Sequence, residues 1–326
     1  MKNLMTAAAL LAIWAAGAEG TFRSADVSEC LSRVENVQNY STENFSAAKI
    51  GKVENPRNDA LPLMPAPLVK GAVKPEIESQ WKGKKVAFLG DSITDKIHVG
   101  TTHNYWDYLP KILGLDAYVY GRNGWQMKGM LDQAKEVMRD FHWYVDALFV
   151  FAGTNDYNGS VPRGEWYETE ECEVNRNGVL MKTPHRRFSF DPNTFRGRIN
   201  QLMDYLKRNF PDQQIVLMTA IHRGYATFGP KNVQPDELYP NKLGLYIDDY
   251  NDDIRAAGRI WSVPVLDLYA RSGLFPLYSE HARAFHDADT DMLHPNATGH
   301  ARLARTMAYW MLTIPSDFKR NDRTFE

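Results

Sequence analysis

The sequence predicts a three-layer α/β/α sandwich built on a five-stranded parallel sheet. Five short apolar runs alternate along the chain with longer segments whose apolar residues recur at helical spacing. Polar residues follow these apolar runs directly, as expected when buried parallel strands end together at one edge of a sheet. Strands that alternate with helices in this way are typical of a parallel sheet covered on both faces.

The elements follow one another in a regular order. The first strand is predicted at residues 85–89 and leads into Gly90-Asp91-Ser92. The other strands are predicted at residues 117–120, 146–151, 214–219 and 263–268. Helices are predicted at residues 104–113, 127–139, 192–210, 246–257 and 296–312. The last of these begins after Asn296, a residue type that is favoured as a helix N-cap.

The first 18 residues are predicted to be a signal peptide. Lys2 supplies a positive charge, and residues 4–14 form an apolar run that is too short to span a bilayer. Ala16-Gly17-Ala18 matches a small-residue cleavage site. We therefore expect an exported protein, periplasmic or extracellular, with no membrane span in the mature chain. An N-terminal membrane anchor is the alternative.

The remaining chain divides into two parts. Residues 19–81 have little periodicity and several prolines, which indicates an extended arm. Residues 82–326 then form the α/β domain, with a polar and irregular insertion at about 157–191. A second long loop is predicted at 224–242. Long insertions in a compact domain are usually functional.

Composition excludes some classes of function. The chain has 326 residues, is 44% hydrophobic and 24% charged, and carries a net charge of -2. This charge balance lacks the excess of basic residues that is typical of proteins that bind nucleic acid. Its two cysteines, Cys30 and Cys172, either form one disulfide after export or remain free thiols. They have no local histidine cluster, so no zinc site is expected.

Four polar blocks are predicted to meet at one edge of the sheet. They are Gly90-Asp91-Ser92, Gly121-Arg122-Asn123-Gly124, Gly153-Thr154-Asn155-Asp156 and Asp291-Met292-Leu293-His294-Pro295. Together, and in this order, they resemble the blocks of the SGNH hydrolase superfamily, also called GDSL hydrolases. The resemblance covers roughly residues 85–312 and implies a flavodoxin-like sheet and serine-based ester hydrolysis. A Gly-x-Ser-x-Gly elbow is absent from the sequence, which argues against an α/β-hydrolase fold.

The resemblance implies a role for three residues. Ser92 matches the nucleophile, His294 the general base and Asp291 the carboxylate that orients the imidazole. The chemistry suits each residue, since imidazole titrates near neutrality and a carboxylate fixes its tautomer. His286, with Asp287 or Asp289, is the alternative base and orienting pair.

An oxyanion hole is expected from the backbone N–H groups of Ser92 and Gly124 and from the side-chain amide of Asn155. Such donors stabilise the charge that develops on a tetrahedral intermediate. Gly121 is the alternative glycine, because the same loop contains both. No nucleotide cofactor is expected, since neither a Gly-x-Gly-x-x-Gly fingerprint after the first strand nor a P-loop is present. No metal is expected either, because a serine mechanism of this kind needs none.

The substrate is expected to be a small-molecule or glycan ester. The candidate substrate-binding residues are Lys96, Trp125, Trp166, His222 and Arg223. A polar rim with tryptophans suits a sugar better than a long acyl chain, so we expect removal of small acyl groups, in particular acetyl, from a carbohydrate. The alternatives are a lipid-directed esterase such as a lysophospholipase, and a non-catalytic carbohydrate-binding protein on the same scaffold.

Overall fold

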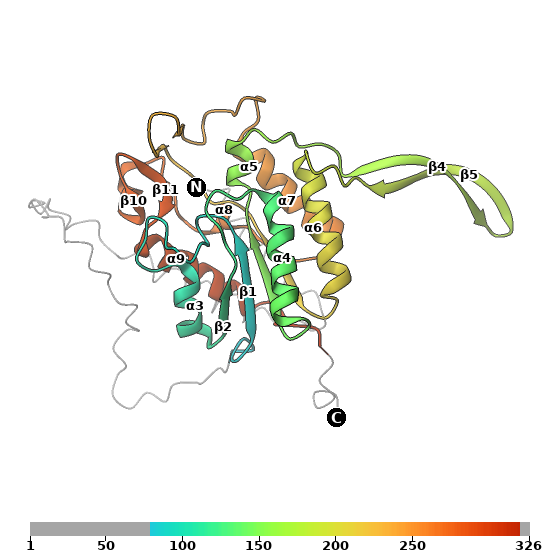
Figure 1. The fold of residues 1–326 in the computed structure, drawn as a ribbon, viewed down its shortest axis with the longest axis horizontal. Coiled ribbons are helices and arrows are strands. Elements are labelled where there is room, and N and C mark those ends of the chain that lie inside the picture. Colours follow the sequence, from blue (N-terminus) through green and yellow to red (C-terminus); the bar gives the residue numbers. More distant parts are fainter. Residues whose placement is uncertain (1–78, 320–326) are drawn as a thin grey trace, which may run out of the picture. The chain divides into compact units, whose positions relative to one another are not determined.

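The computed structural model describes residues 79–319, and its centre is a sheet of five parallel strands (Figure 1). They are β1 (Lys85–Gly90), β2 (Asp116–Val119), β3 (Ala147–Phe151), β6 (Gln214–Met218) and β9 (Val265–Leu266). Their spatial order is β2-β1-β3-β6-β9, which is the order 2-1-3-4-5 of flavodoxin-like folds. The predicted five-stranded parallel sheet is confirmed.

Helices cover both faces of this sheet. One core contains α4 (Met127–Phe141), α6 (Phe195–Asn209) and α7 (Ile247–Trp261), and the opposite core contains α3 (Tyr105–Leu113) and α9 (Ala297–Met311). The central strands β1, β3 and β6 are almost entirely buried, because both of their faces carry apolar residues. The three-layer arrangement that the alternating pattern predicts is therefore confirmed.

Side-chain caps fix where several helices begin. Asn104 caps α3 in a capping box with Asp107, and Thr194 accepts a hydrogen bond from Gly197 N at the start of α6. The predicted N-cap Asn296 is confirmed, since its side chain accepts from the backbone N–H groups of Thr298 and Gly299.

A small antiparallel sheet accompanies the main one, in the order β10-β11-β7-β8. Its strands are β10 (Phe285–Asp287), β11 (Asp291–Pro295), β7 (Ala226–Thr227) and β8 (Val233–Gln234). The short helices α5 (Thr154–Asn158) and α8 (Leu268–Arg271) and the 3-10 helix η1 (Ser279–Ala284) complete the described chain. The sequence pattern predicts most of these segments as loop, because they are too short for a periodicity to emerge.

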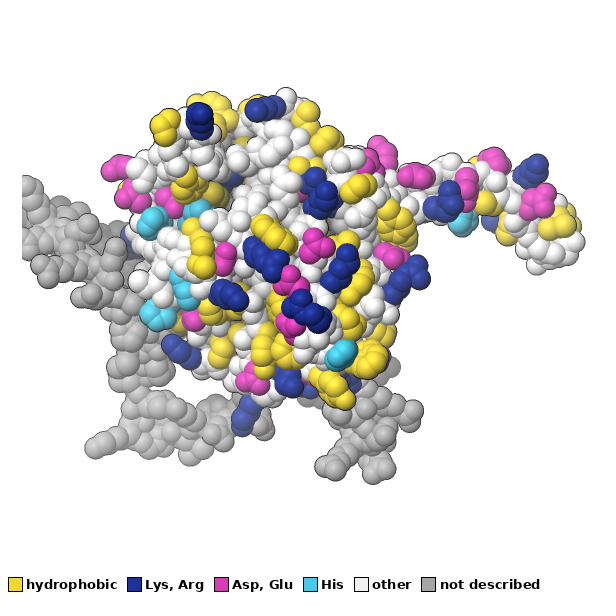
Figure 2. Space-filling view, viewed as in Figure 1, with side chains coloured by type: hydrophobic (Ala, Val, Ile, Leu, Met, Phe, Trp, Pro, Cys, Tyr) yellow, Lys and Arg dark blue, Asp and Glu magenta, His cyan; other side chains and the backbone are white. Residues whose placement is uncertain are grey.

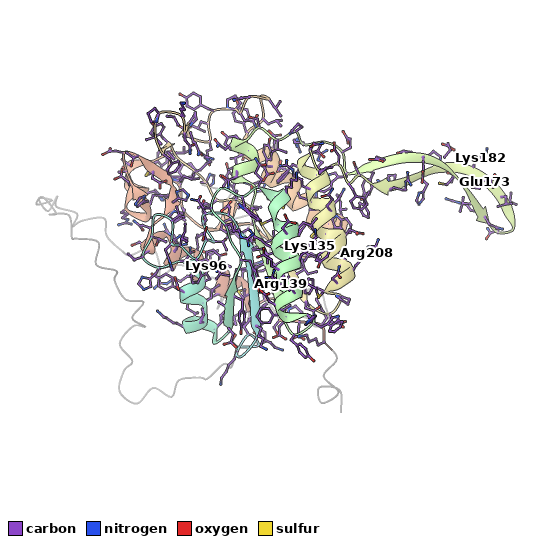
Figure 3. The ribbon with its side chains drawn as sticks, viewed as in Figure 1. Lys96, Lys135, Arg139, Glu173, Lys182 and Arg208 are labelled. Carbon is purple, nitrogen blue, oxygen red and sulfur yellow. The ribbon has the colours of Figure 1, made fainter. Side chains whose placement is uncertain are left out.

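The insertion at residues 157–191 is not irregular as predicted. Most of it forms an antiparallel hairpin of β4 (Tyr167–Arg176) and β5 (Val179–Phe188), which extends away from the sheet and its helices (Figure 1). Asn177 and Gly178 have φ angles of 55° and 86° and make the turn. Figure 2 shows basic and acidic side chains interspersed along the hairpin. Glu173 and Lys182, labelled in Figure 3, lie directly opposite each other on its strands.

The predictions of a signal peptide, of an extended arm and of a possible disulfide concern residues that lie wholly or partly outside the described range. The signal peptide and nearly all of the arm lie outside residues 79–319, as does Cys30. Cys172 lies on β4 and carries a free thiol. Between residues 79 and 319, no helix combines the length and the apolar character needed to cross a membrane.

Candidate active site

The site lies at the carboxyl ends of β1 and β3. These strands are neighbours, with Gly90 at the end of β1 paired with Phe151 at the end of β3. The chain leaves β1 for β2 on one side, whereas β3 lies on the other side, so this position is the topological switch point of the sheet. Ligands bind at such points in open α/β sheets. Ser92 follows β1 here, and Asn155 follows β3.

Ser92, His294 and Asp291 form one chain of hydrogen bonds. His294 Nε2 lies 2.9 Å from Ser92 Oγ, and His294 Nδ1 lies 2.9 Å from Asp291 Oδ2. The carboxylate can only accept, so His294 Nδ1 carries the proton and Nε2 presents its lone pair to the serine hydroxyl. Each of the three residues is 4% exposed. This arrangement can move a proton from the serine to the imidazole.

The local fold of β11 makes Asp291 and His294 converge. Asp291 Oδ1 accepts hydrogen bonds from the backbone N–H groups of Leu293 at 3.2 Å and His294 at 3.0 Å. His286 is a further neighbour, with Nδ1 3.0 Å from Asp291 Oδ2. Burial favours a raised pKa for Asp291, but the hydrogen bonds and charge of His294 outweigh it and lower the pKa below its ordinary value. Asp291 is therefore a carboxylate over the neutral pH range.

Possible oxyanion donors surround Ser92. Among residues 79–319, the backbone N–H groups of Ser92 and Gly124 donate to no acceptor. Asn155 Nδ2 donates one hydrogen bond to Trp125 O at 3.0 Å, which leaves its second N–H available. Gly124 has a φ of 77° and open space at its Cα, whereas a Cβ on Gly121 would lie 2.7 Å from the Thr94 backbone. Gly121 thus allows close packing, and Gly124 is the more accessible glycine.

Buried polar residues that the sequence pattern did not single out hold these loops. Asp95 accepts from Asn123 N at 2.6 Å and so ties the loop after β1 to the loop of Gly124. The Gln133 amide of α4 makes two hydrogen bonds with the backbone of Gly90, at 2.8 and 2.9 Å. The only sequence signal for Asp95 is a carboxylate five residues after Gly90, the glycine that ends β1.

Asp156 fixes the loop of Asn155 through hydrogen bonds to α4 and α6. It accepts from Met127 N at 2.7 Å, at the start of α4, and from Arg198 Nη1 at 2.8 Å. Burial raises its pKa to about 6, although both hydrogen bonds and the arginine charge oppose this shift. The Gly-Thr-Asn-Asp block therefore contributes an anchor as well as a possible oxyanion donor.

Phe228 is a further neighbour that the sequence pattern did not identify. It lies in the turn between β7 and β8, with its ring in an edge contact with the His294 imidazole at a centroid distance of 5.5 Å. Its side chain is 45% exposed, so part of the ring faces solvent beside the site. The β7–β8 turn has an irregular sequence, and only pairing with β11 brings it to His294.

The structure does not bring all five predicted substrate-binding residues together. Trp125 lies beside the Gly124 loop, where its ring packs on Gly129 and on Arg122. Lys96, labelled in Figure 3, follows the Ser92 loop and is exposed. Trp166 lies at the base of the hairpin near Arg196 of α6, and no contact joins it to Ser92.

Two of the five have different surroundings from those expected. Arg223 is 1% exposed, and its guanidinium donates to Gln234 at 2.7 Å and Thr154 at 3.3 Å, so it supports the loops from inside. His222 pairs with Glu237 and stacks on Tyr269. The Arg223 guanidinium is thus directed into the protein, whereas the His222 side chain is 17% exposed and has only its Nδ1 bonded to the buried Glu237.

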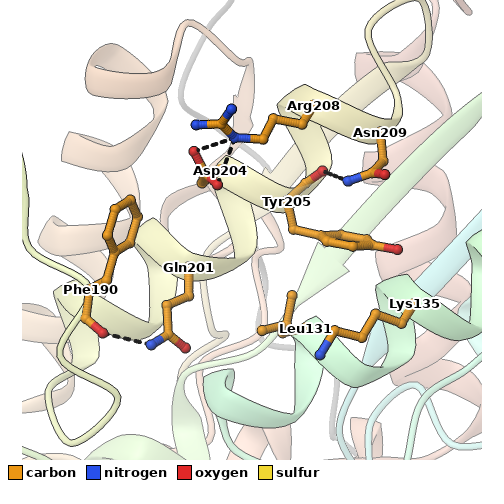
Figure 4. A pocket seen from close by; sticks show the side chains of 8 residues that line it. All are labelled: Leu131, Lys135, Phe190, Gln201, Asp204, Tyr205, Arg208 and Asn209. Atoms are coloured by element: carbon orange, nitrogen blue, oxygen red, sulfur yellow. Dashed lines mark hydrogen bonds and ion pairs between the residues drawn. The ribbon is translucent and has the colours of Figure 1, made fainter.

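A separate depression of about 300 Å³ lies between α4 and α6 (Figure 4). It is lined by Leu131, Lys135, Phe190, Gln201, Asp204, Tyr205, Arg208 and Asn209. Several of its polar side chains already have partners, since Arg208 pairs with Asp204 and Gln201 donates to Phe190 O. None of the proposed reactive groups lies there, so we place the chemistry at Ser92.

One cluster of possible metal ligands occurs between residues 79 and 319. Ligand atoms of Glu170, Cys172 and His185 lie within 4.8 Å of one another on the hairpin. Glu170 is already paired with Arg187 at 2.9 Å. Desolvation and the Glu170 carboxylate raise the pKa of Cys172, which opposes the thiolate that a metal requires. The cluster therefore carries no metal assignment.

Comparisons with known proteins show what this chain resembles. A model of the GDSL-like Lipase/Acylhydrolase family matches residues 88–302. A solved structure of a protein from Lactobacillus plantarum is 26% identical, with a TM-score of 0.56, over 71% of this chain and 98% of that one. A possible lipase from Chitinophaga pinensis is 20% identical, with a TM-score of 0.52, over 70% and 98% of the two chains.

An acetylxylan esterase from Geobacillus stearothermophilus is more distant, at 16% identity and a TM-score of 0.43 over 73% of this chain and 98% of that one. Among curated proteins, no match was found.

Proposed function

This chain belongs to the GDSL-like Lipase/Acylhydrolase family of serine ester hydrolases, and we propose that it is an exported esterase that removes small acyl groups, in particular acetyl, from a carbohydrate. The observation that carries the catalytic part of this proposal is the hydrogen-bonded chain from Ser92 through His294 to Asp291. The export rests on the predicted signal peptide at residues 1–18.

In the first half of the reaction, Ser92 Oγ attacks the ester carbonyl carbon while His294 Nε2 accepts the hydroxyl proton. Asp291 stabilises the imidazolium that results. The tetrahedral intermediate then collapses, His294 gives its proton to the leaving alcohol, and the acyl group remains on Ser92. In the second half, His294 deprotonates a water molecule that attacks the acyl carbon. The second tetrahedral intermediate then collapses with cleavage of the bond to Ser92 Oγ, His294 returns the proton to this oxygen, and the acid is released.

The negative charge on the tetrahedral intermediate requires donors beside Ser92. We assign this role to the backbone N–H groups of Ser92 and Gly124 and to the Asn155 amide, which have capacity to donate. Donors fixed in advance stabilise the transition state without reorganising during the reaction. Asp95 and Asp156 hold the two loops that carry Gly124 and Asn155.

The preference for a small acyl group is supported by the close surroundings of the nucleophile. Ser92 is buried, and the Phe228 ring occupies space beside His294. A carbohydrate is supported by the exposed tyrosines of the loops after β6, Tyr225, Tyr239 and Tyr246, which combine a flat apolar ring with a polar group. Trp125, whose carbonyl oxygen accepts from the Asn155 amide, adds a further aromatic ring near the site.

A substrate panel tests the proposal. Wild-type enzyme is assayed with p-nitrophenyl acetate, p-nitrophenyl octanoate and acetylated xylan, and Ser92→Ala is the matched control. We expect acetate and acetylated xylan to be hydrolysed in preference to octanoate, and Ser92→Ala to lower kcat by about 10⁴-fold or more. A strong preference for octanoate would favour a lipid-directed esterase. Retained turnover in Ser92→Ala would contradict the nucleophile assignment.

A second variant tests the oxyanion assignment. Asn155→Ala is expected to lower kcat by about 10²-fold or more while KM changes little, because the amide bonds mainly to the transition state. Asn175→Ala, on the hairpin, is the control and should behave as the wild type. A rise in KM with unchanged kcat would show instead that Asn155 binds the ground state.

A further inference from the structure

We propose that His286 is a positioning residue that shares the Asp291 carboxylate with His294 and adds a second ionisation to the reaction. This inference rests on the proposed function, because it acts through the Asp291–His294 pair. His286 Nδ1 and His294 Nδ1 lie 3.0 and 2.9 Å from the same oxygen, Asp291 Oδ2. One carboxylate therefore orients two imidazoles.

The protonation of His286 follows from this geometry. A carboxylate oxygen can only accept, so His286 Nδ1 carries a hydrogen when it bonds to Asp291. The His286 side chain is 53% exposed, in contrast to the 5% of His294. Because imidazole has a second nitrogen, His286 can take up a proton from solvent at Nε2 without losing the hydrogen bond to Asp291.

The backbone holds both rings against the carboxylate. His286 lies on β10 where the register with β11 shifts, between the pairs Phe285–Pro295 and Asp287–Asp291. A Cβ on Gly100, which has a φ of 70°, would lie 3.0 Å from both the His286 and the His294 Cβ atoms. Gly100 therefore packs against both histidines at once. His286 is therefore held in place beside Asp291 by the packing of Gly100 and by its position on β10.

Other charged groups lie around the pair in the described chain, among them Asp91, whose carboxyl group interacts with His294, and the charged side chains of η1, which packs against β10. Asp287 on β10 feels the charge of His286, and the guanidinium of Arg223 acts on Asp291 from the interior. On the segment of Gly100, His98 is paired with Asp107 at 2.8 Å. β7, on the other side of β11, contributes only Ala226 and Thr227. Asp291 is thus the carboxylate to which both histidines bind directly.

Two states of His286 have opposite effects on the reaction. A neutral His286 donates a hydrogen bond that fixes the carboxylate in the orientation needed by His294. A protonated His286 places a positive charge beside Asp291, which weakens the ability of this carboxylate to stabilise the His294 imidazolium in the transition state. Acidification therefore impairs the reaction through His286 as well as through protonation of His294.

Two substitutions separate these effects. His286→Asn keeps an amide donor near the position of Nδ1 but cannot be protonated, and His286→Ala removes both properties. At pH 8 we expect His286→Ala to lower kcat for p-nitrophenyl acetate by about tenfold with little change in KM, and His286→Asn to restore kcat to within about twofold of wild type. His142→Asn, at the exposed end of α4, is the control.

The pH profile of kcat/KM gives the decisive readout. On the acid side, the profiles of the wild-type enzyme and of the His142→Asn control should contain one ionisation more than the profile of His286→Asn. Superimposable profiles for wild type and His286→Asn would overturn the proposal, as would equal losses of kcat in the Asn and Ala variants. Circular dichroism verifies folding, and if His286→Ala does not fold, the profile of His286→Asn still decides.

A failure of the proposed function looks different from a failure of this inference. The former is reported by retained activity in Ser92→Ala, whatever the His286 variants do. The latter is reported by His286 variants with wild-type kcat and pH profile in an enzyme that still depends on Ser92.

Discussion

Asp91, the residue before Ser92, is a buried carboxyl group that is 2% exposed. Burial raises its pKa to about 7, the hydrogen bond from Ile93 N and the charge of His294 oppose this, and the charge of Asp156 adds to it. Its ordinary value is 3.8, so the folded protein holds this proton far more tightly than the unfolded chain does. The carboxyl group is therefore most compatible with the fold when it is protonated.

This residue makes stability depend on pH in a defined direction. A raised pKa in the folded state contributes stability that is fully present below about pH 4 and is lost as the pH rises through about 7. Asp91→Asn mimics the protonated form at every pH and can still accept from Ile93 N. We expect its advantage in free energy of unfolding over wild type to be larger at pH 8 than at pH 5, by about 2 kcal/mol.

Urea denaturation of both proteins at the two pH values measures this difference. Other titrating groups are common to the two proteins and cancel in the comparison. Asp252→Asn, on the solvent side of α7, serves as the control and should show no such pH dependence. An equal effect of Asp91→Asn at pH 5 and pH 8 would contradict a raised pKa.

At the scale of residues, a side-chain contact can be predicted from the sequence when the two residues are close along the chain. Asp291 and His294 are three residues apart, and their contact follows from this spacing. Asp95 reaches Asn123, and Gln133 reaches Gly90, only through tertiary packing, so no spacing reveals these contacts. Arg223 was expected to bind substrate because it follows the fourth strand of the sheet, yet its hydrogen bonds to Gln234 and Thr154 hold its guanidinium inside the protein.

Among the elements, the hairpin of β4 and β5 is the one that the sequence analysis described wrongly. Period-two alternation identifies a strand only when one face is apolar, and most residues of this hairpin are exposed on both faces. The signal was Asn177-Gly178, a dipeptide that favours tight hairpin turns. The five strands of the sheet were predictable because burial on both faces gives them continuous apolar runs.

We expect that most of the hairpin can be removed without affecting the core. Its base is closed by the pair Tyr167–Phe188, and Phe188 also stacks on Trp261 at 4.2 Å. Replacing residues 168–187 by Asn-Gly joins this pair through a two-residue turn. We expect the shortened protein to keep kcat/KM for p-nitrophenyl acetate within about twofold, because the proposed catalytic groups lie on other elements.

Acetylated xylan serves as the second substrate for the shortened protein. A selective loss on xylan would assign the hairpin to polymer binding, and equal losses on both substrates would show that the hairpin supports the site itself. Thermal unfolding of the wild-type and shortened proteins checks that the core is intact.

At the scale of the whole described chain, the residues at the two ends of the strands of the main sheet have different roles. The carboxyl edge carries Ser92 and Asn155, whereas the amino edge joins the two ends of the described segment. Trp81, which precedes β1, is fully buried and donates from Nε1 to Met311 O at the end of α9, at 2.7 Å. Lys84 pairs with Asp317 on the same edge. Stability and catalysis therefore depend on residues at opposite ends of the strands.

Trp81 provides the test of this separation. Trp81→Ala removes a large buried ring that contacts Phe149 and breaks the hydrogen bond to Met311 O, so we expect the free energy of unfolding to fall by about 3–5 kcal/mol. Trp81→Phe retains much of the packing without the N–H donor and should lose about 1–2 kcal/mol. At a temperature where both variants remain folded, kcat and KM should match the wild type, because the ring lies at the edge remote from Ser92. A fall in kcat that follows the loss of stability across the two variants would show that the two edges are coupled through the strands.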